Sequence, residues 1–238
     1  MLDLFCGAGG AAVGYHRAGF EVVGVDIAPQ PHYPFPFVRC DWRNALTYER
    51  EWIERMTGGP FDAIHASPPC QAYSSLRVMK NARQHQDLVA AVRKALRDDG
   101  WPYVIENVEG APLLDPITLC GSQFGLGSQG AGLKRHRLFE TSWPIFALLP
   151  PCAHPRVTLG VYGSKVRDIA LEKRHYAKDK ATRGAPVGVV LPQARGFEAM
   201  GIDWMTIAEA SEAIPPAYTE FIGRQLMEHL SLVATRCG

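Results

Sequence analysis

Cys70 is the residue whose type and setting most suggest chemistry. It lies in the segment SPPCQAYS, residues 67–74, where Pro68 and Pro69 stiffen the turn after an apolar run. A thiol held on such a turn can become a thiolate, which is the nucleophilic form of cysteine. Position alone leaves two interpretations open, a nucleophile at a crevice or a thiol with a structural role.

A glycine-rich loop near the amino terminus could hold a ligand. The segment DLFCGAGG, residues 3–10, has glycines that let a ligand approach the backbone closely. Its spacing is not the dinucleotide pattern G-x-G-x-x-G, and the loop lacks the Lys-Ser/Thr of a P-loop. Asp26 follows about 20 residues later, where a carboxylate can accept both ribose hydroxyls. S-adenosylmethionine fits these features better than NAD, because it has a ribose and no pyrophosphate.

Two further features each allow two interpretations. Asp41 could accept from the adenine amine of such a ligand, or it could cap a helix before Asn44. Residues 165–183 contain seven Lys or Arg against three acidic residues. This excess of positive charge is typical of a solvated surface or of a phosphate-binding strip.

The elements that must position these residues alternate between strands and helices. Short apolar runs predict strands at 2–5, 22–25, 62–66 and 103–105, with a weaker one at 37–39. Helices are expected at 11–18 and 81–97, each followed by glycine. This alternation predicts an α/β fold with a doubly wound, mainly parallel sheet. The polar residues that follow the five strands should meet in one crevice: Cys6, Asp26, Asp41, Cys70 and Glu106.

Composition predicts an ordinary globular chain of 238 residues with a net charge of +1. No apolar run reaches the roughly 20 residues that a membrane helix needs. The six cysteines include no C-x-x-C pair, so we expect mostly buried thiols, no dense disulfide framework and no metal site. We expect a domain at 1–143, a small, irregular insert at 144–194 and a closing segment at 195–238.

Five segments occur in the following order along the chain: DLFCGAGG, GVDI, SPPCQAYS, IENV and LKRHRLF. Together they resemble the cytosine-5 DNA methyltransferases. The segments LCGSQFGL and IPPAYTEFIG are similar to the compact phage or prophage type of that family. The resemblance covers residues 2–143 and 195–230. It implies a Rossmann-like fold dependent on S-adenosylmethionine, with the insert as a target-recognition region.

The resemblance also implies catalytic roles. Cys70 would add as a thiolate to C6 of cytosine, so that C5 can attack the methyl group. Because a free thiol has a pKa of about 8.5, the site should lower the pKa of Cys70 or supply a base. Glu106 would act at N3, best with a raised pKa. Arg135 and Arg137 match the two arginines of the family's basic segment, and Arg137 would contact O2 and help hold the thiolate.

The expected cofactor is S-adenosylmethionine, leaving as S-adenosylhomocysteine. The residues expected to bind it come from the glycine loop, the ends of the next two strands and the Pro-Pro turn. They are Phe5, Cys6, Gly7, Gly9, Gly10, Asp26, Ile27, Asp41, Trp42 and Pro69.

The expected partner is double-stranded DNA with the target cytosine flipped out, because the base cannot be reached inside a duplex. Residues 73–85 could close over the flipped base or be an ordinary connection. Basic residues expected to contact DNA are Arg77, Lys80, Arg83, Lys165, Arg167, Lys173 and Arg174. The short insert favours a short recognition sequence. We expect a monomer with no membrane partner, in the cytoplasm of a bacterial or phage-infected cell, within restriction-modification.

Alternative functions remain at this point. One is the same chemistry on RNA, such as tRNA, and another is a catalytically silent DNA-binding relative. A nicotinamide oxidoreductase is disfavoured by the glycine spacing and has no use for Pro-Pro-Cys. A donor carrying a group other than methyl would use the same thiolate step.

Overall fold

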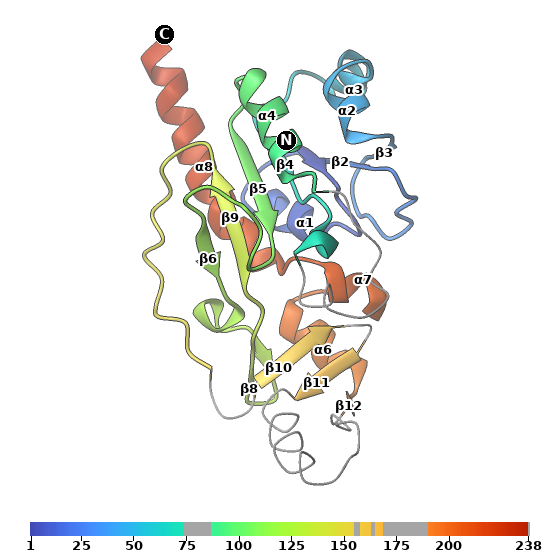
Figure 1. The fold of residues 1–238 in the computed structure, drawn as a ribbon, viewed down its shortest axis with the longest axis vertical. Helices are drawn as coiled ribbons and strands as arrows, with labels where there is room; N and C mark the ends of the chain where they lie inside the picture. Colours follow the sequence, from blue (N-terminus) through green and yellow to red (C-terminus); the bar gives the residue numbers. More distant parts are fainter. Residues whose placement is uncertain (74–86, 155–157, 163–164, 169–189, 238) are drawn as a thin grey trace.

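The computed structural model describes residues 1–73, 87–154, 158–162, 165–168 and 190–237 (Figure 1). Five basic residues expected to contact DNA lie outside these ranges: Arg77, Lys80, Arg83, Lys173 and Arg174. So does most of the expected closing loop at 73–85. The side chain of Arg167 is also outside the description, although its backbone lies in a strand.

The first sheet has seven strands in the order β3-β2-β1-β4-β5-β9-β6. They are β1 (Leu2–Leu4), β2 (Val23–Asp26), β3 (Phe37–Arg39), β4 (Ile64–Ala66), β5 (Tyr103–Asn107), β6 (Ile117–Leu119) and β9 (Arg137–Thr141). The first five in this order are parallel, whereas β9 runs antiparallel to both neighbours. All five expected strands are therefore confirmed. The order reverses between β1 and β4, which is where such sheets bind ligands.

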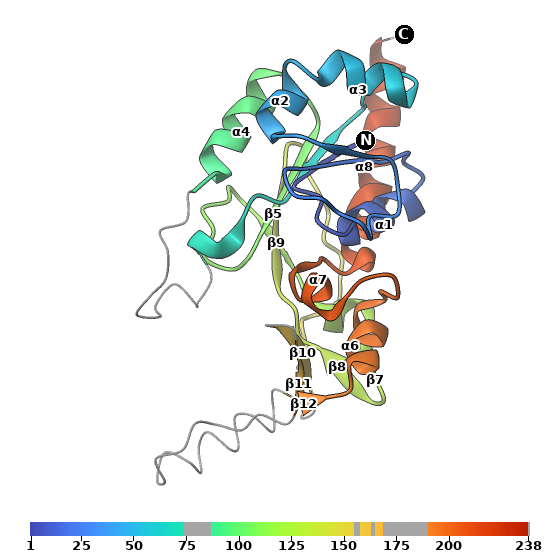
Figure 2. The same ribbon diagram turned by 90° about the vertical axis from the view of Figure 1, so that its right-hand side faces the viewer.

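Helices cover both faces of this sheet, as the doubly wound prediction requires (Figure 2). On one face lie α1 (Gly10–Arg17) and α8 (Pro216–Cys237). On the other lie α2 (Trp42–Leu46), α3 (Arg50–Thr57) and α4 (Val89–Asp98). Each layer has its own buried core, with Tyr15 and Ile222 in the first and Ile53 and Leu96 in the second.

Helix α4 begins later than the apolar pattern predicted. The expected range was 81–97, but the helix starts at Val89. The Asp87 carboxylate accepts from the backbone N–H of Val89 at 3.1 Å, which satisfies a donor that the first turn leaves free. The apolar pattern of the sequence does not indicate where a side chain such as Asp87 will begin the helix.

A second sheet has the order β12-β11-β10-β8-β7 and packs against two helices. Its strands are β7 (Gly127–Ser128), β8 (Ala131–Leu133), β10 (Thr158–Tyr162), β11 (Lys165–Asp168) and β12 (Val190–Leu191), and the helices are α6 (Gln193–Met200) and α7 (Ile207–Glu212). The insert expected to be irregular thus contributes three strands, and the sheet begins before residue 143. The reason is a non-local pairing, since β10 lies parallel to β8.

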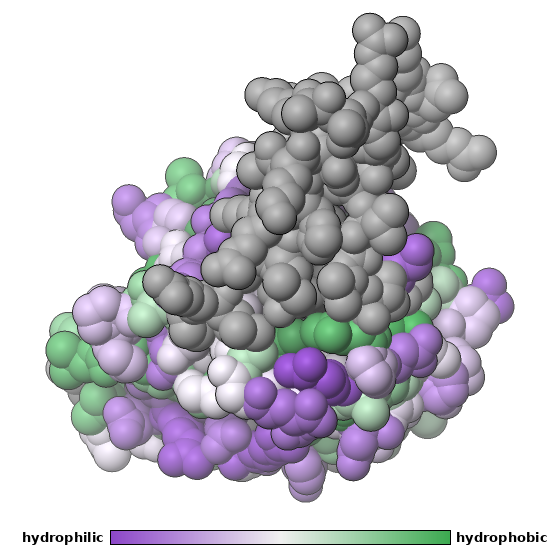
Figure 3. Space-filling view, turned by 90° about the horizontal axis from the view of Figure 1, so that it is seen from below, coloured by the Kyte–Doolittle hydropathy of each residue, from purple (hydrophilic) through white to green (hydrophobic). Residues whose placement is uncertain are grey.

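Much of the described surface at the second-sheet end is hydrophilic, with a short apolar strip (Figure 3). There are also two short 3-10 helices, η1 (Cys70–Ala72) and η3 (Gly121–Phe124). Among the described residues, no helix is long and apolar enough to cross a membrane.

Candidate active site

A cavity of about 370 Å³ opens at the carboxyl ends of β1, β2, β4 and β5. Four of the five residues expected to meet there line it: Cys6, Asp26, Cys70 and Glu106. Arg137 also lines it, so the thiol, a carboxyl group and a guanidinium share one space with the glycine loop.

The three glycines of the loop differ in what they do. Gly7 lines the cavity with a φ of +49°, and a Cβ added there would meet nothing within 4 Å. The space in front of Gly7 is therefore open to a ligand. At Gly10 a Cβ would lie 2.4 Å from the carbonyl oxygen of Ile214, so glycine permits the closing segment to approach helix α1. Gly9 does not line the cavity and packs against Tyr33 instead.

Asp26 and the residues around it form one wall. The Asp26 carboxylate accepts from Gly7 N–H at 3.1 Å and Ala28 N–H at 2.9 Å, which fixes its position and leaves further lone pairs. Ile27 lines the cavity with 68% of its surface exposed, so it offers an apolar surface at this wall. Phe5 and Pro69 also line this space.

Asp41 and Trp42, expected at the adenine end, lie outside the cavity lining. Asp41 accepts from the backbone N–H of Arg43 at 2.9 Å and so caps helix α2. Of its two interpretations, the helix cap is the one that the contacts show. Trp42 is buried beside the ring of Phe5, with centroids 6.0 Å apart, and supports a cavity residue from behind.

The reactive end of the cavity is built on the segments after β4 and at the end of β5. Cys70 opens the 3-10 helix η1, and the Asn107 side chain donates to the carbonyl of Pro68 at 2.9 Å, which holds the Pro-Pro turn. The buried Glu106 carboxylate pairs with Arg137 Nε at 3.1 Å. Ser67 also hydrogen-bonds the Glu106 side chain.

Burial dominates the electrostatics of these groups. It raises the pKa of Glu106, with Arg137 and the Ser67 hydrogen bond opposing the shift. Burial and then the Glu106 charge raise the pKa of the Cys70 thiol, while Arg137 lowers it. Of the two expected means of activating Cys70, a lowered pKa or a base, a lowered pKa is not found, because desolvation and a neighbouring carboxylate outweigh one guanidinium.

Arg135 lies away from the cavity, although its sequence neighbourhood suggested a catalytic position. It is fully buried and donates to the carbonyl of Val161 at 2.8 Å and to that of Ser211 at 2.7 Å. These contacts join β10 to α7. Lys165 is exposed on β11 and does not line the cavity either.

Sequence reasoning missed the part of the wall that comes from the closing segment. Glu209, Glu212, Ala213 and Ile214 line the cavity, and Trp204 donates to the carbonyl of Ala8 at 2.8 Å. No local pattern marks these residues, because their approach to the glycine loop depends on tertiary packing. Asp3 lies in the segment DLFCGAGG, but the sequence pattern did not indicate it as a site residue.

Residues 1–114 match the family described as C-5 cytosine-specific DNA methylase. Curated relatives include the type II methyltransferases M.NgoMIV of Neisseria gonorrhoeae, 31% identical over 117 residues, and M.HindV of Haemophilus influenzae, 30% identical over 118 residues. These matches cover 48% and 45% of this chain but only 36% and 37% of the relatives. The chain therefore matches little more than a third of their length.

Two solved structures share the fold across nearly the whole chain. A protein described as a DNA modification methyltransferase encoded within an Escherichia coli prophage has a TM-score of 0.62 at 18% identity, covering 97% of this chain and 99% of its own. The Dnmt2 methyltransferase of S. pombe has a TM-score of 0.56 at 11% identity, with coverages of 96% and 98%.

The fold is of the Rossmann-like class, which the chain shares with these two methyltransferase structures. Within that class, the amino-terminal part of the chain is identified with the C-5 cytosine-specific DNA methylases. The resemblance seen in the sequence motifs is confirmed.

Proposed function

We propose that this protein transfers a methyl group from S-adenosylmethionine to C5 of cytosine in DNA. The observation that carries the proposal is the single cavity in which Cys70, Glu106 and Arg137 lie beside the glycine loop and Asp26. This arrangement supports a mechanism in which a thiol nucleophile and a ribose-containing donor act on the same substrate base.

The cavity fits the proposed donor. Gly7 leaves open the space that a side chain would fill, the Asp26 carboxylate is fixed by two backbone N–H groups, and Ile27 offers an uncovered apolar surface. When bound, S-adenosylmethionine supplies an electrophilic methyl group on a sulfonium. We assign its ribose to Asp26 and its adenine to Ile27 and Phe5.

Cys70 acts as the nucleophile. Its thiolate forms a bond to C6 of cytosine, and Glu106 in its neutral form donates a proton to N3. C5 then forms a bond to the methyl group as the bond between that methyl group and the sulfonium sulfur breaks. The C5 proton afterwards passes to water, the C6–S bond breaks to return the thiolate, and N3 returns its proton to the Glu106 carboxylate. Arg137 holds O2 of the base.

The raised pKa of Glu106 acts on both groups in this scheme. While Glu106 is charged, it disfavours the Cys70 thiolate. Once Glu106 is protonated, the nearest charge is that of Arg137, which favours the thiolate. Burial of Glu106 therefore serves both N3 protonation and activation of the nucleophile.

DNA is the proposed substrate, with the target cytosine rotated out of the duplex into the cavity. Phosphate contacts must offset the few kcal/mol that unstacking costs. We assign such contacts to the exposed Lys165 and to the other basic residues predicted from the sequence. The small second sheet favours a short recognition sequence.

The test is mass spectrometry of nucleosides from host DNA and RNA after expression of the wild type and Cys70→Ala. Cys40→Ala is the control, because Cys40 lies outside the cavity lining. We expect 5-methylcytosine in DNA with the wild type and the control, and none above background with Cys70→Ala. Modification confined to RNA would show that the substrate is RNA and not DNA. A different cytosine adduct would show that the donor is not S-adenosylmethionine. No product from a folded protein that binds S-adenosylmethionine would favour a silent relative.

A further inference from the structure

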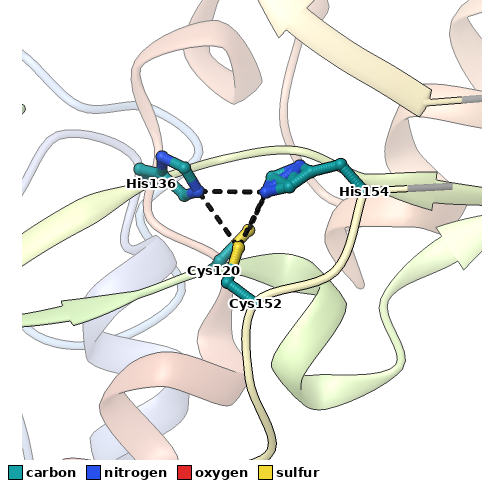
Figure 4. Close-up of side chains that lie close together, drawn as sticks. All are labelled: Cys120, His136, Cys152 and His154. Atoms are coloured by element: carbon teal, nitrogen blue, oxygen red, sulfur yellow. Dashed lines mark hydrogen bonds between the residues drawn. The ribbon is translucent and has the colours of Figure 1, made fainter.

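Four metal-ligating side chains from three separate segments converge beside β9 (Figure 4). Cys120 follows β6, His136 precedes β9, and Cys152 and His154 lie beyond residue 150. One ligand atom from each side chain lies within 4.8 Å of all the others. We propose that this Cys2His2 cluster is a zinc site that ties the segment after residue 150 to the edge of the first sheet.

Three of the four distances between ligand atoms are close to what zinc requires, and the fourth, between His154 Nε2 and the Cys152 sulfur, is shorter. The Nε2 atom of His154 lies 2.7 Å from the Cys152 sulfur, 3.2 Å from His136 Nε2 and 3.8 Å from the Cys120 sulfur. His136 Nε2 lies 3.3 Å from the Cys152 sulfur. A tetrahedral zinc ion with two sulfur and two nitrogen ligands sets neighbouring ligand atoms about 3.3 to 3.8 Å apart. Only small shifts would therefore admit the ion.

The residues around the cluster orient its ligands. The other ring nitrogen of His136, Nδ1, lies 3.1 Å from a Glu109 carboxylate oxygen, and donation there leaves the Nε2 lone pair directed at the cluster. The Ser122 hydroxyl lies 3.5 Å from the sulfur of Cys120 and 3.6 Å from that of Cys152. A hydroxyl between two sulfurs is a suitable donor to thiolates.

The donor set selects zinc by charge as well as by geometry. Two sulfur and two imidazole ligands in a tetrahedral arrangement are typical of structural zinc sites. Binding would release one proton from each thiol, so that two thiolates balance the two positive charges of the ion. Both histidines would bind in their neutral form.

The site would also fix the entry to β9. Arg137 NH1 donates to the carbonyl of His136 at 2.9 Å, and Arg137 Nε pairs with Glu106. His136 comes immediately before Arg137, so a zinc ion bound to His136 would help to position Arg137 in the cavity. This consequence rests on the proposed function. The metal site itself does not depend on it.

This proposal replaces the sequence-based expectation of no metal site. That expectation rested on the absence of a C-x-x-C pair, but the ligands come from distant segments and only Cys152 and His154 are near neighbours in the chain. The expectation of mostly buried thiols also fails for the described cysteines, since Cys152 is exposed and two others are only partly buried.

The test is metal analysis of the full chain by inductively coupled plasma and native mass spectrometry. Cys152→Ala and His154→Ala are the variants, because both residues are exposed and neither leaves a hole in a core. Cys40→Ala is the matched control, since Cys40 is outside the cluster. We expect about one zinc ion per chain in the wild type and the control, and its loss in both cluster variants. Cobalt added to the metal-free wild type should give the visible absorption of a tetrahedral thiolate site.

Three results would overturn the proposal. One is a wild type that takes up no zinc when zinc chloride is added. Another is zinc content unchanged in both cluster variants. The third is a mass two hydrogens lower under reducing conditions, with peptide mapping that joins Cys120 to Cys152 as a disulfide. Each readout is independent of methyl transfer, so failure of the zinc site and failure of the proposed activity are separate outcomes.

Discussion

At the scale of single residues, the cavity sets ionisable groups against one another. The charge of Glu106 raises the pKa of Cys70, and the charge of Arg137 lowers it. Burial raises the pKa of both the thiol and the Glu106 carboxyl group. The ion pair between Glu106 and Arg137 holds the two opposing charges together beside the Cys70 thiol. The protonation state of Glu106 thus decides the net charge that Cys70 experiences.

The reactivity of Cys70 should follow these charges. Glu106→Gln removes the negative neighbour, so the pKa of Cys70 should fall, and Arg137→Gln should raise it. The measurement is the pH dependence of iodoacetamide alkylation, followed at the Cys70 peptide by mass spectrometry. We expect the midpoint to move to lower pH in Glu106→Gln and to higher pH in Arg137→Gln. An unchanged midpoint in both variants would show that burial alone controls the thiol.

Asp3 is a second buried carboxyl group with consequences for stability. Its side chain is fully buried, burial raises its pKa to about 8, and Tyr33 donates to it at 3.4 Å. Between about pH 4 and pH 8 the folded chain keeps a proton that the unfolded chain has lost. Rising pH through this window therefore lowers the free energy of unfolding, by up to about 1.4 kcal/mol per pH unit from this group.

Asp3→Asn should remove that pH dependence, because the amide imitates the neutral acid. We expect the variant to exceed the wild type by a few kcal/mol in free energy of unfolding at pH 7.5, on the order of 1 to 4. The two should converge near pH 4. Urea denaturation at both pH values is the measurement, with the exposed Asp203→Asn as control. A difference that does not change with pH would mean that Asp3 is charged when buried.

At the scale of elements, a buried ion pair fastens α4 to β9. Arg93 donates to Glu140 through Nε at 2.8 Å and NH2 at 2.7 Å, with side-chain exposures of 12% and 2%. Glu140 also accepts from the backbone N–H of Leu114 at 2.9 Å. This arrangement holds the helix and the segment after β5 against an antiparallel strand.

Removing one partner should be costly. We expect Arg93→Met to lower the free energy of unfolding by about 3 to 5 kcal/mol, because Glu140 would stay buried without its partner. Lys94→Met is the neighbouring control, since Lys94 pairs with Asp98 at 75% and 60% exposure. That change should cost less than about 1 kcal/mol. Equal losses in chemical denaturation would contradict the importance of burial.

At the scale of the whole molecule, the closing segment joins the two sheets. Its Trp204 reaches the glycine loop, its residues 212–214 form part of the cavity wall, and Arg135 connects α7 to β10. The candidate active-site cavity therefore depends on contacts between parts of the chain far apart in sequence.

Arg135→Met should loosen this junction. The buried carbonyl of Val161 and the partly buried carbonyl of Ser211 would lose the hydrogen bonds from Arg135, and the buried one should cost about 1 to 3 kcal/mol. We expect faster hydrogen exchange in peptides covering β10 and α7, with little change in β1 and β4. Arg224→Met is the control, because Arg224 is 69% exposed and pairs within α8. Unchanged exchange at β10 and α7 would show that Arg135 is not needed for the connection.

The local elements of the first sheet could be predicted from the sequence. Strands β1, β2, β4 and β5 are short apolar runs followed by polar residues, a pattern set by local burial on both faces. Residues at strand ends, such as Cys70 and Glu106, could be assigned to one crevice because parallel strands share an edge. The second sheet escaped prediction because β10 pairs with β8 across a long stretch of chain.

The sequence by itself therefore determined the doubly wound sheet, the glycine loop and the candidate chemistry of Cys70. Each of these depends on residues close together in the chain or on the common edge of a parallel sheet. Only the tertiary structure decided that Arg135 is a buried connector, that Asp41 is a helix cap, and that Cys120 and His154 meet. Those outcomes depend on which distant segments pack together, and local residue patterns do not predict that packing.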